Sequence, residues 1–422
     1  MKNQHDRFLD NLPSGWTFDR LKDVVALRNE KTSEATADED YLELEDLESG
    51  TGRILNRRST LEVESAVTVF KKGDILFGKL RPYLEKYCEA DFDGKCTGEI
   101  LAFKPERLAS RFLFYCVGSR WFIQRCNALA YGAKIRASVG QPNYRNSTFH
   151  SQRCPNKSRF AAYLDASCAA IDAAVAAKRQ QIGTLDGVRR DVVQSAVTRG
   201  LEDRPALKST GNVWFSEMPS NWELVSLKRV SEMQTGLTLG KVYEGPFIER
   251  PYLRVANVQD GHLTLEDVTT IDVPEAVARR VELCTGDVLM TEGGDLDKLG
   301  RGTIWRGQIR GCLHQNHIFA IRCIKHKLLP EFLAYLTASR YGRDYFEATG
   351  KRTTNLASTN STKVGMFPIP RPSIAEQRAI CRFLDQRLEQ LSRVVSGIEA
   401  QIHALTAYRK SLIHECRPAA RD

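Results

Sequence analysis

The chain carries the same ordered series of short sequences twice, and this duplication constrains its fold more than any other feature. PSGW at 13–16 recurs as PSNW at 219–222, and GDIL at 73–76 recurs as GDVL at 286–289. LKDV and LKRV, and later YLD and FLD, keep the same order in the two halves. Ordered self-similarity of this extent indicates two copies of one structural unit.

Each copy ends in a segment whose apolar residues recur every seven positions, in two interleaved rows with no internal proline. This is the pattern of a coiled-coil seam, and roughly 40 residues at about 1.5 Å of rise each give a helix of about 60 Å. Two such seams most simply pack on each other, and an antiparallel pairing would set the two globular domains at opposite ends of a rod. Two independent helices are the alternative, but the heptads outlast a usual globular helix. The predicted seam consists of Leu164, Ile171, Val175, Ile182, Leu185, Val192, Leu384, Leu391, Val395, Ile398, Ile402, Leu405 and Leu412.

The segments before the two helices read as mixed domains. Short β-type runs such as 67–70 and 317–321 accompany helical stretches near 109–127 and 330–348, so largely antiparallel strands are expected. We predict an α+β fold in which two mixed α/β domains are separated by two long helices that pair as an antiparallel coiled coil, with a pseudo-twofold internal repeat. The predicted segments are a first domain at 1–157, a first helix at 158–203, a second domain at 204–372 and a second helix at 373–416.

The composition places the chain among globular proteins. Of its 422 residues, 42% are hydrophobic and 27% are charged, which is enough to build a core. The first residues lack an apolar stretch and no run of about 18 apolar residues occurs, so we expect neither a secretory signal nor a membrane span. The 11 cysteines include no CxxC pair. These features predict a cytoplasmic protein with reduced thiols and without a disulfide framework or a zinc site.

Positive charge gathers in two tracts. The formal net charge is +9, although residues 34–48 are strongly acidic. Residues 134–159 contain six Lys or Arg and no acid, and residues 296–327 contain seven against the single Asp297. Such tracts point to a polyanion, with nucleic acid as the first choice. A solvated charged surface would give the same pattern.

The sequence matches no enzyme motif in full. A base methyltransferase would need a paired-proline loop and a GxGxxG turn, and neither occurs. The segment 73–80 imitates a phosphate-binding loop, but Leu80 stands where a magnesium-binding Ser or Thr is required. Glu292 and Asp295 could be metal carboxylates, but acids beside a Gly-Gly turn more often fix a loop. The chain is therefore predicted to have no catalytic site and no metal site.

Several strings resemble one known family. They are GKLRPYLEK at 78–86, FAAYLDASCAAID at 160–172, PYLRVANVQDG at 251–261, LMTEGGDLDKLGRG at 289–302 and FPIPRPSIAEQRAICRFLD at 367–385. Together with the duplication, which covers nearly the whole chain, they make the sequence similar to the specificity subunit of a type I restriction–modification system.

This resemblance implies a function. Each globular half would be a target recognition domain that reads one half of a bipartite, asymmetric site in double-stranded DNA. The helices would fix the gap between the half-sites and dock two methyltransferase subunits. Catalysis would lie in partner subunits, which bind S-adenosylmethionine for adenine methylation, and ATP and Mg²⁺ for cleavage by the helicase-nuclease restriction subunits. No cofactor is expected in this chain.

The resemblance and the basic tracts suggest which residues contact DNA. Basic side chains hold phosphates, and polar ones read base edges. A solvated surface charge is an equal explanation for each single basic residue, and Asn257 and His317 could equally serve a loop backbone. The candidates are Lys79, Arg81, Tyr83, Lys86, Lys134, Arg136, Arg254, Asn257, Lys298, Arg301, Asn316, His317, Lys351 and Arg352.

One alternative function and one irregular segment remain. The alternative is a coiled-coil adaptor whose two domains bind proteins or glycans instead of DNA. The basic tracts and the family strings both argue against it.

The irregular segment is 141–159, which lacks the Pro-x-Pro and Glu-Gln sequences that precede the second helix. It resembles a short passage translated out of frame between two in-frame ends, and true divergence is the other explanation.

Overall fold

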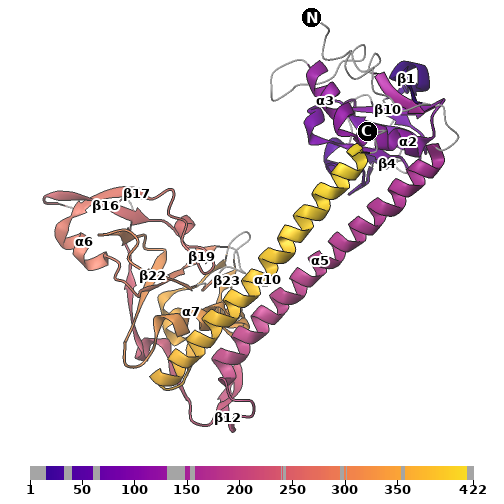
Figure 1. Ribbon diagram of the computed structural model, residues 1–422. Coiled ribbons are helices and arrows are strands. Elements are labelled where there is room, and N and C mark those ends of the chain that lie inside the picture. Colours follow the sequence, from indigo (N-terminus) through magenta and orange to yellow (C-terminus); the bar gives the residue numbers. More distant parts are fainter. Residues whose placement is uncertain are drawn as a thin grey trace, which may run out of the picture. The chain divides into compact units, whose positions relative to one another are not determined.

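The structure is a computed structural model, and it divides into two compact units. The first unit consists of residues 1–179 together with 398–422, and the second consists of residues 180–397. The long helices α5 (Lys157–Arg199) and α10 (Ile374–Glu415) each contribute to both units (Figure 1). The structure describes residues 16–32, 40–59, 67–130, 148–152, 157–238, 240, 244–294, 299–300, 302–352 and 357–415.

The first unit is built on two small sheets. One is an antiparallel sheet of four strands in the order β2-β10-β7-β8, and the other has five strands in the order β3-β6-β9-β4-β5. Helices α2 (Ser110–Gly118) and α3 (Arg120–Leu129) pack beside them. The strands are β2 (Val25–Leu27), β3 (Lys31–Thr32), β4 (Asp40–Leu42), β5 (Arg58–Ser59), β6 (Val67–Phe70), β7 (Ile75–Gly78), β8 (Tyr87–Glu89), β9 (Gly94–Cys96) and β10 (Ile100–Pro105), with β1 (Trp16–Arg20) paired to β11 (Thr148–Gln152) and the short helix α1 (Leu21–Val24) between β1 and β2.

The second unit has a four-stranded antiparallel sheet in the order β15-β22-β18-β20 and two three-stranded sheets, β17-β16-β21 and β19-β24-β23. Its strands are β12 (Leu207–Asn212), β13 (Phe215–Pro219), β14 (Glu223–Ser226), β15 (Ser231–Thr235), β16 (Phe247–Leu253), β17 (Thr269–Pro274), β18 (Val288–Thr291), β19 (Gly293–Gly294), β20 (Gly302–Ile304), β21 (Leu313–His314), β22 (Ile318–Cys323), β23 (Lys351–Arg352), β24 (Ala357–Ser358) and β25 (Pro368–Arg371). Its short helices are α6 (Glu275–Val281), α7 (Pro330–Ala338), α8 (Arg340–Thr349) and α9 (Ser361–Met366).

The two units repeat one topology. The sheet order β2-β10-β7-β8 corresponds strand by strand to β15-β22-β18-β20, and the parallel pair β4-β9 corresponds to β16-β21. The helix pair α2-α3 corresponds to α7-α8, and the second helix of each pair is capped by the same residue type, Ser119 or Ser339. The predicted α+β fold with an internal repeat is therefore confirmed.

The recurring Gly-Asp motif is explained by a buried carboxylate that pairs with a partly exposed arginine. Asp74 and Asp287 are both at most 2% exposed. Arg28 Nε donates to Asp74 at 2.7 Å, while Arg322 Nε and Nη2 donate to Asp287 at 2.9 and 2.8 Å. Each carboxylate also accepts a backbone N–H three residues upstream, at 2.8 Å in both copies. Since a buried carboxylate needs such partners, the motif fixes the turn that leads into β7 or β18.

The recurring Leu-Asp motif ties each domain to its helix. Tyr115 Oη in α2 donates to Asp165 of α5 at 2.6 Å, and Tyr335 Oη in α7 donates to Asp385 of α10. Burial and the neighbouring carboxylate raise the pKa of both phenols, so each stays a hydrogen-bond donor. The repeated motif thus anchors equivalent helices at equivalent places.

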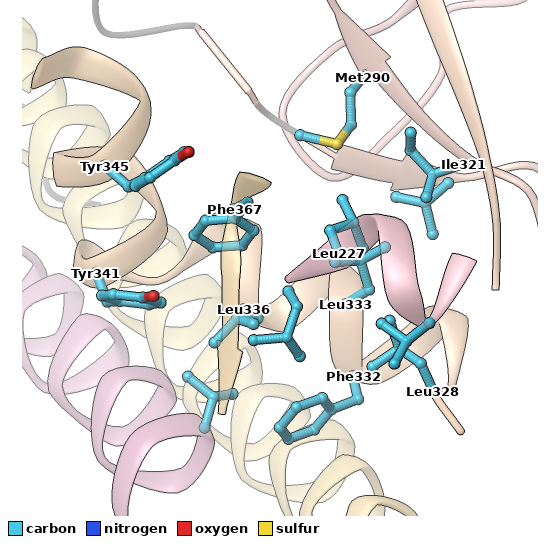
Figure 2. Packing of buried hydrophobic residues seen from close by; sticks show 14 of the residues in the cluster. Leu227, Met290, Ile321, Leu328, Phe332, Leu333, Leu336, Tyr341, Tyr345 and Phe367 are labelled. Atoms are coloured by element: carbon cyan, nitrogen blue, oxygen red, sulfur yellow. The ribbon is translucent and has the colours of Figure 1, made fainter. Parts of the chain in front are cut away.

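Apolar side chains of α7 and α8 organise the core of the second unit (Figure 2). Phe332, Leu333 and Leu336 of α7 are fully buried, as their helical spacing requires. The ring of Phe367 stacks on Tyr341, with centroids 5.4 Å apart. Val193 of α5 and Leu384 of α10 belong to the same core, so the end of one long helix and the start of the other are held by this domain.

The long helices also pack on each other within the first unit. Asp172 of α5 lies 3.1 Å from Arg409 of α10, and Lys178 donates to Gln401. From the first contact to the second, the residue number rises along α5 and falls along α10. The two helices are therefore antiparallel, as predicted. All the predicted seam residues are buried or half-buried.

By length and composition alone, one helix of the described residues, Ser158–Arg199, could cross a membrane. The sequence expectation considered only uninterrupted apolar runs, whereas this helix owes its hydropathy to many alanines between charged residues. Leu164 and Val193 of the helix are buried in the two protein cores, which favours a packed helix.

Candidate nucleic-acid interface

In the first unit, the loop between β7 and β8 carries four of the predicted DNA contacts. Arg81 and Glu85 have positive φ angles of 50° and 52°, which are unfavourable for residues with a Cβ. They flank a single 3₁₀ turn, Pro82–Leu84, whose Tyr83 is 55% exposed. Backbone strain of this kind is often found at binding sites, and here it presents an aromatic ring beside cationic residues.

The two lysines of this loop differ in their surroundings. Lys86 is half-buried, and its Nζ donates to the carbonyl of Leu47, so it holds the loop against the neighbouring segment. Lys79 is half-buried as well, and its backbone N–H donates to the carbonyl of Glu99 at 2.9 Å. No hydrogen bond or ion pair of its ammonium group to another described residue is found. Lys79 therefore remains the better candidate for an external anion.

In the second unit, the segment that follows β18 gathers several polar residues. His317 Nδ1 lies 2.6 Å from Glu292 Oε2, and their side chains are 53% and 30% exposed. The next residues form β19, which pairs with β24, which in turn pairs with β23. This small sheet brings the exposed Lys351 close to the Glu292 segment, although the two lie far apart in sequence. Lys351 thus lies in the same small sheet as the residues after Glu292, with β24 between them.

Asn257 has a structural position instead. It is 3% exposed, its Oδ1 accepts the N–H of Arg254 at 2.8 Å, and its Nδ2 donates to the carbonyls of Thr264 and Asp267. Its hydrogen-bonding capacity is thus used within the domain, and of the two uses that the sequence left open, the structure favours the loop backbone. Asp46 plays the same part in the first unit, where it accepts the N–H of Glu43 at 2.8 Å.

The remaining predicted DNA contacts either have partners within the domain or lie partly or wholly outside the described residues. Arg254 Nη2 donates to the exposed Asp267 at 2.9 Å. Asn316 is half-buried and its N–H donates to the carbonyl of Leu237 at 2.9 Å. The backbone of Arg352 lies in β23, and its side chain is outside the described residues. Four further candidates also lie outside the described residues: Lys134, Arg136, Lys298 and Arg301.

Sequence reasoning considered Glu292 only as a metal carboxylate. Within the described part of the chain, no group of three or more His, Cys, Asp or Glu side chains could hold a metal ion. The partner of Glu292 is the imidazole of His317, which the strand register places across from it. His317 was a candidate DNA contact in the sequence, but the sequence does not reveal which residue faces it.

A buried histidine, His314, lies in β21, three residues before His317 in the sequence. His314 of β21 is fully buried, with Nδ1 3.1 Å from the carbonyl of Val281, and its Nε2 has no described partner. Burial lowers the pKa of His314 to about 4. The imidazole is therefore neutral near pH 7 and contributes to the fold of the domain rather than to the charge of the surface.

Arg409 of α10 lies at a heptad position of the second long helix, and it is not among the site residues predicted from the sequence. It is 6% exposed, and its two terminal nitrogens donate to the carbonyls of Gly50 and Thr51 at 3.1 and 3.0 Å. Its Nε is 3.1 Å from Asp172 of α5. A charged group at a heptad position was the available signal, but its target is a turn far away in the sequence.

The equivalent place in the second unit is a cavity of about 530 Å³. Arg189, which holds the heptad position of Arg409, lines this cavity together with Gly302 and Ala334. By strand register and helix alignment these two small residues correspond to Tyr87 and Phe114, whose rings lie 5.2 Å apart in the first unit. The two copies therefore differ in whether aromatic rings fill this site.

Sequence comparisons find similar proteins among the specificity subunits of type I restriction enzymes. The chain is 25% identical over 201 residues to the putative type I restriction enzyme MjaX specificity subunit of Methanocaldococcus jannaschii, covering 47% of this chain and 46% of that protein. It is 24% identical over 311 residues to the type I restriction enzyme EcoKI specificity subunit of Escherichia coli K12, covering 71% and 62%. The chain thus spans less than two thirds of the length of these relatives. No family model matches.

Solved structures share the fold. A chain from a study of complex assembly and conformational transition of the type I R-M system matches with a TM-score of 0.71, 18% identity and coverage of 96% of this chain and 97% of that chain. The HsdS subunit of Thermoanaerobacter tengcongensis matches with a TM-score of 0.55, 18% identity and coverage of 97% and 98%. The fold and the comparisons define a duplicated two-domain protein with two long helices. The sequence is similar to type I restriction enzyme specificity subunits, and the fold is that of the solved HsdS subunit.

Proposed function

We propose that this chain is the DNA-recognition subunit of a type I restriction–modification complex, and that each domain reads one half of a bipartite, asymmetric site. The observation that carries the proposal is the duplication, because two domains share one scaffold while their exposed loops differ. Identical loops would read identical half-sites, whereas the loops after β7 and β18 have different sequences. The exposed basic residues beside these loops would hold phosphates and give a salt-dependent affinity.

The long helices have a separate role in this proposal. They hold the two recognition domains at the spacing of the half-sites, and they offer docking surfaces for two methyltransferase subunits. Methylation of adenine with S-adenosylmethionine and cleavage driven by ATP with Mg²⁺ belong to partner subunits. This chain contributes specificity and is not an enzyme itself. Because it would bind chromosomal DNA, we expect the chain in the cytoplasm.

Methylome sequencing tests the proposal. A host with an otherwise active system is sequenced with and without the gene, and a bipartite motif methylated at adenine is expected to vanish with the gene. Replacing residues 215–366 by those of another family member is expected to change only one half of the motif. A methylome that is the same in both hosts would contradict the proposal and leave a non-DNA adaptor as the explanation.

A further inference from the structure

The strand registers place two residue pairs at the same position of the duplicated sheet. In the first unit Ile100 of β10 faces Gly78 of β7, and in the second Ile318 of β22 faces Thr291 of β18. The next pair outward is Lys79 with Glu99 in the first unit and Glu292 with His317 in the second. The same backbone hydrogen bond joins each pair, from N–H of Lys79 to the carbonyl of Glu99 at 2.9 Å, and from N–H of Glu292 to the carbonyl of His317 at 2.8 Å.

The side chains at this shared position have opposite chemistry. The β7 end carries an ammonium group in the first unit, while the β18 end carries a carboxylate in the second. Across from them stand a carboxylate, Glu99, and an imidazole, His317. Glu99 and His317 are exposed, and Lys79 and Glu292 are half-exposed. The backbone hydrogen bond is the same in the two units, whereas the side chains at this position differ.

We infer that this pair position determines specificity in both recognition domains, an inference that rests on the proposed function. Lys79 donates to the O6 and N7 acceptors of guanine, which are the groups a cation reads in the major groove. Glu292 accepts a hydrogen bond from the exocyclic amino group of cytosine or adenine. The two half-sites therefore differ in the kind of base read at the equivalent place.

The contact between His317 and Glu292 fits this role. The imidazole nitrogen, 2.6 Å from Oε2, holds the carboxylate in one orientation and leaves Oε1 available for a base. In the second unit Lys351 lies in the same small sheet as the residues after Glu292, with β24 between them. A cation there can hold the DNA backbone while the carboxylate reads a base edge. His317 is thus a positioning residue for Glu292.

The test uses the complete complex in a host, with the methylome as readout. Glu292→Gln keeps the size of the side chain and removes its charge, and is expected to relax discrimination by about tenfold or more at one position of one half-site. The double variant Glu292→Lys with His317→Glu installs the chemistry of the first unit, and is expected to shift that position toward guanine. Glu266→Gln, at an exposed residue of the same domain, is the matched control and should leave the motif unchanged.

The outcomes separate this inference from the proposed function. A motif relaxed at one position, with the other half-site intact, supports the inference. If the wild-type chain directs a bipartite motif but Glu292→Gln leaves it unchanged, the inference is wrong and the proposed function stands. A uniform drop in methylation at all sites without a change of motif also overturns it, because a phosphate contact or a structural role would act in that way.

Discussion

Replacing Arg409 by methionine is expected to destabilise the first unit by about 3 kcal/mol. The change keeps an unbranched apolar stem, although a shorter one, and removes two hydrogen bonds from a charged donor, each worth roughly 1.5–3 kcal/mol. It leaves the carbonyl of Thr51 and the carboxylate of Asp172 without this partner. The folded protein no longer bears the desolvation penalty of a buried guanidinium, which offsets part of the loss. The expected destabilisation is therefore at the lower end of the summed hydrogen-bond energies.

Arg189→Met is the matched control, because Arg189 holds the same heptad position in the other long helix. It is exposed, and no hydrogen bond or ion pair joins it to another described residue. Its replacement should change stability by no more than about 0.5 kcal/mol. The internal repeat thus supplies two substitutions of the same type in the same kind of helix, with and without the buried contacts.

Hydrogen exchange read by mass spectrometry measures both variants, because peptides from each unit report separately. A loss of about 3 kcal/mol speeds exchange of the most protected amides in the first unit by roughly a hundredfold, since about 1.4 kcal/mol corresponds to a factor of ten. Peptides of the second unit should be unaffected. Equal effects of the two variants, or a loss located in the second unit, would refute the role assigned to the Arg409 contacts.

Three further outcomes are expected. The pKa of His314 is about 4 in the folded state and about 6.5 in the unfolded chain, so the unfolded chain binds the extra proton between these pH values. The free energy of unfolding of the second unit should therefore fall by up to about 3 kcal/mol as the pH falls from about 6.5 toward 4. Urea unfolding at several pH values measures this, and His314→Asn should flatten the dependence of the free energy on pH. Phe114→Ala should cost the first unit about 3–5 kcal/mol, whereas Ala334→Phe should cost the second less than about 1 kcal/mol because a cavity receives the ring; thermal melts compare them. Resequencing the codons of residues 141–159 is expected to restore an open frame that encodes Pro-x-Pro and Glu-Gln, and an unchanged reading in independent isolates would contradict this.

The genetic code supports the last of these expectations. Codons can be chosen for Thr148–Ser158 that, read from the third base onward, give Leu-Pro-Phe-Pro-Ala-Leu-Pro-Glu-Gln-Ile. The second copy has Pro-x-Pro at 368–370 and Glu376-Gln377 at the matching place, where Gln377 is fully buried and its Nε2 donates to the carbonyl of Pro372 at 3.0 Å. Codons that restore this junction in another frame favour a local frame error over true divergence.

Patterns that depend on local spacing were sufficient to predict much of the fold. The duplication, the heptads and the helices near 109–127 and 330–348 were all visible, because periodicity and repeated strings need no knowledge of distant contacts. The helix pairs α2-α3 and α7-α8 lie where they were expected. The Gly-Asp motif could be seen as a repeat, but its purpose required the position of an arginine on another strand.

The candidate interface could be predicted only in part. Asn257 lies in a string that the family shares, yet its buried amide serves a backbone turn, and no local pattern separates that use from base reading. The pairing of Glu292 with His317 depends on the register of β18 and β22, which hydrophobic alternation alone does not determine. Registers and buried polar contacts are long-range properties, so the sequence did not reveal the partners of these residues.

The contribution of α10 to the first unit has a consequence for synthesis on the ribosome. Residues 180–397 form a continuous stretch, so the second unit has all of its own residues as soon as that stretch has emerged. Domains usually fold in the order in which they are made, but here Arg409 and its neighbours are translated after the whole second unit. The carbonyl groups of Gly50 and Thr51 therefore lack the Arg409 guanidinium as a hydrogen-bond donor during most of translation. The domain that begins first is the one completed last, and a chaperone would meet it in the unfinished state.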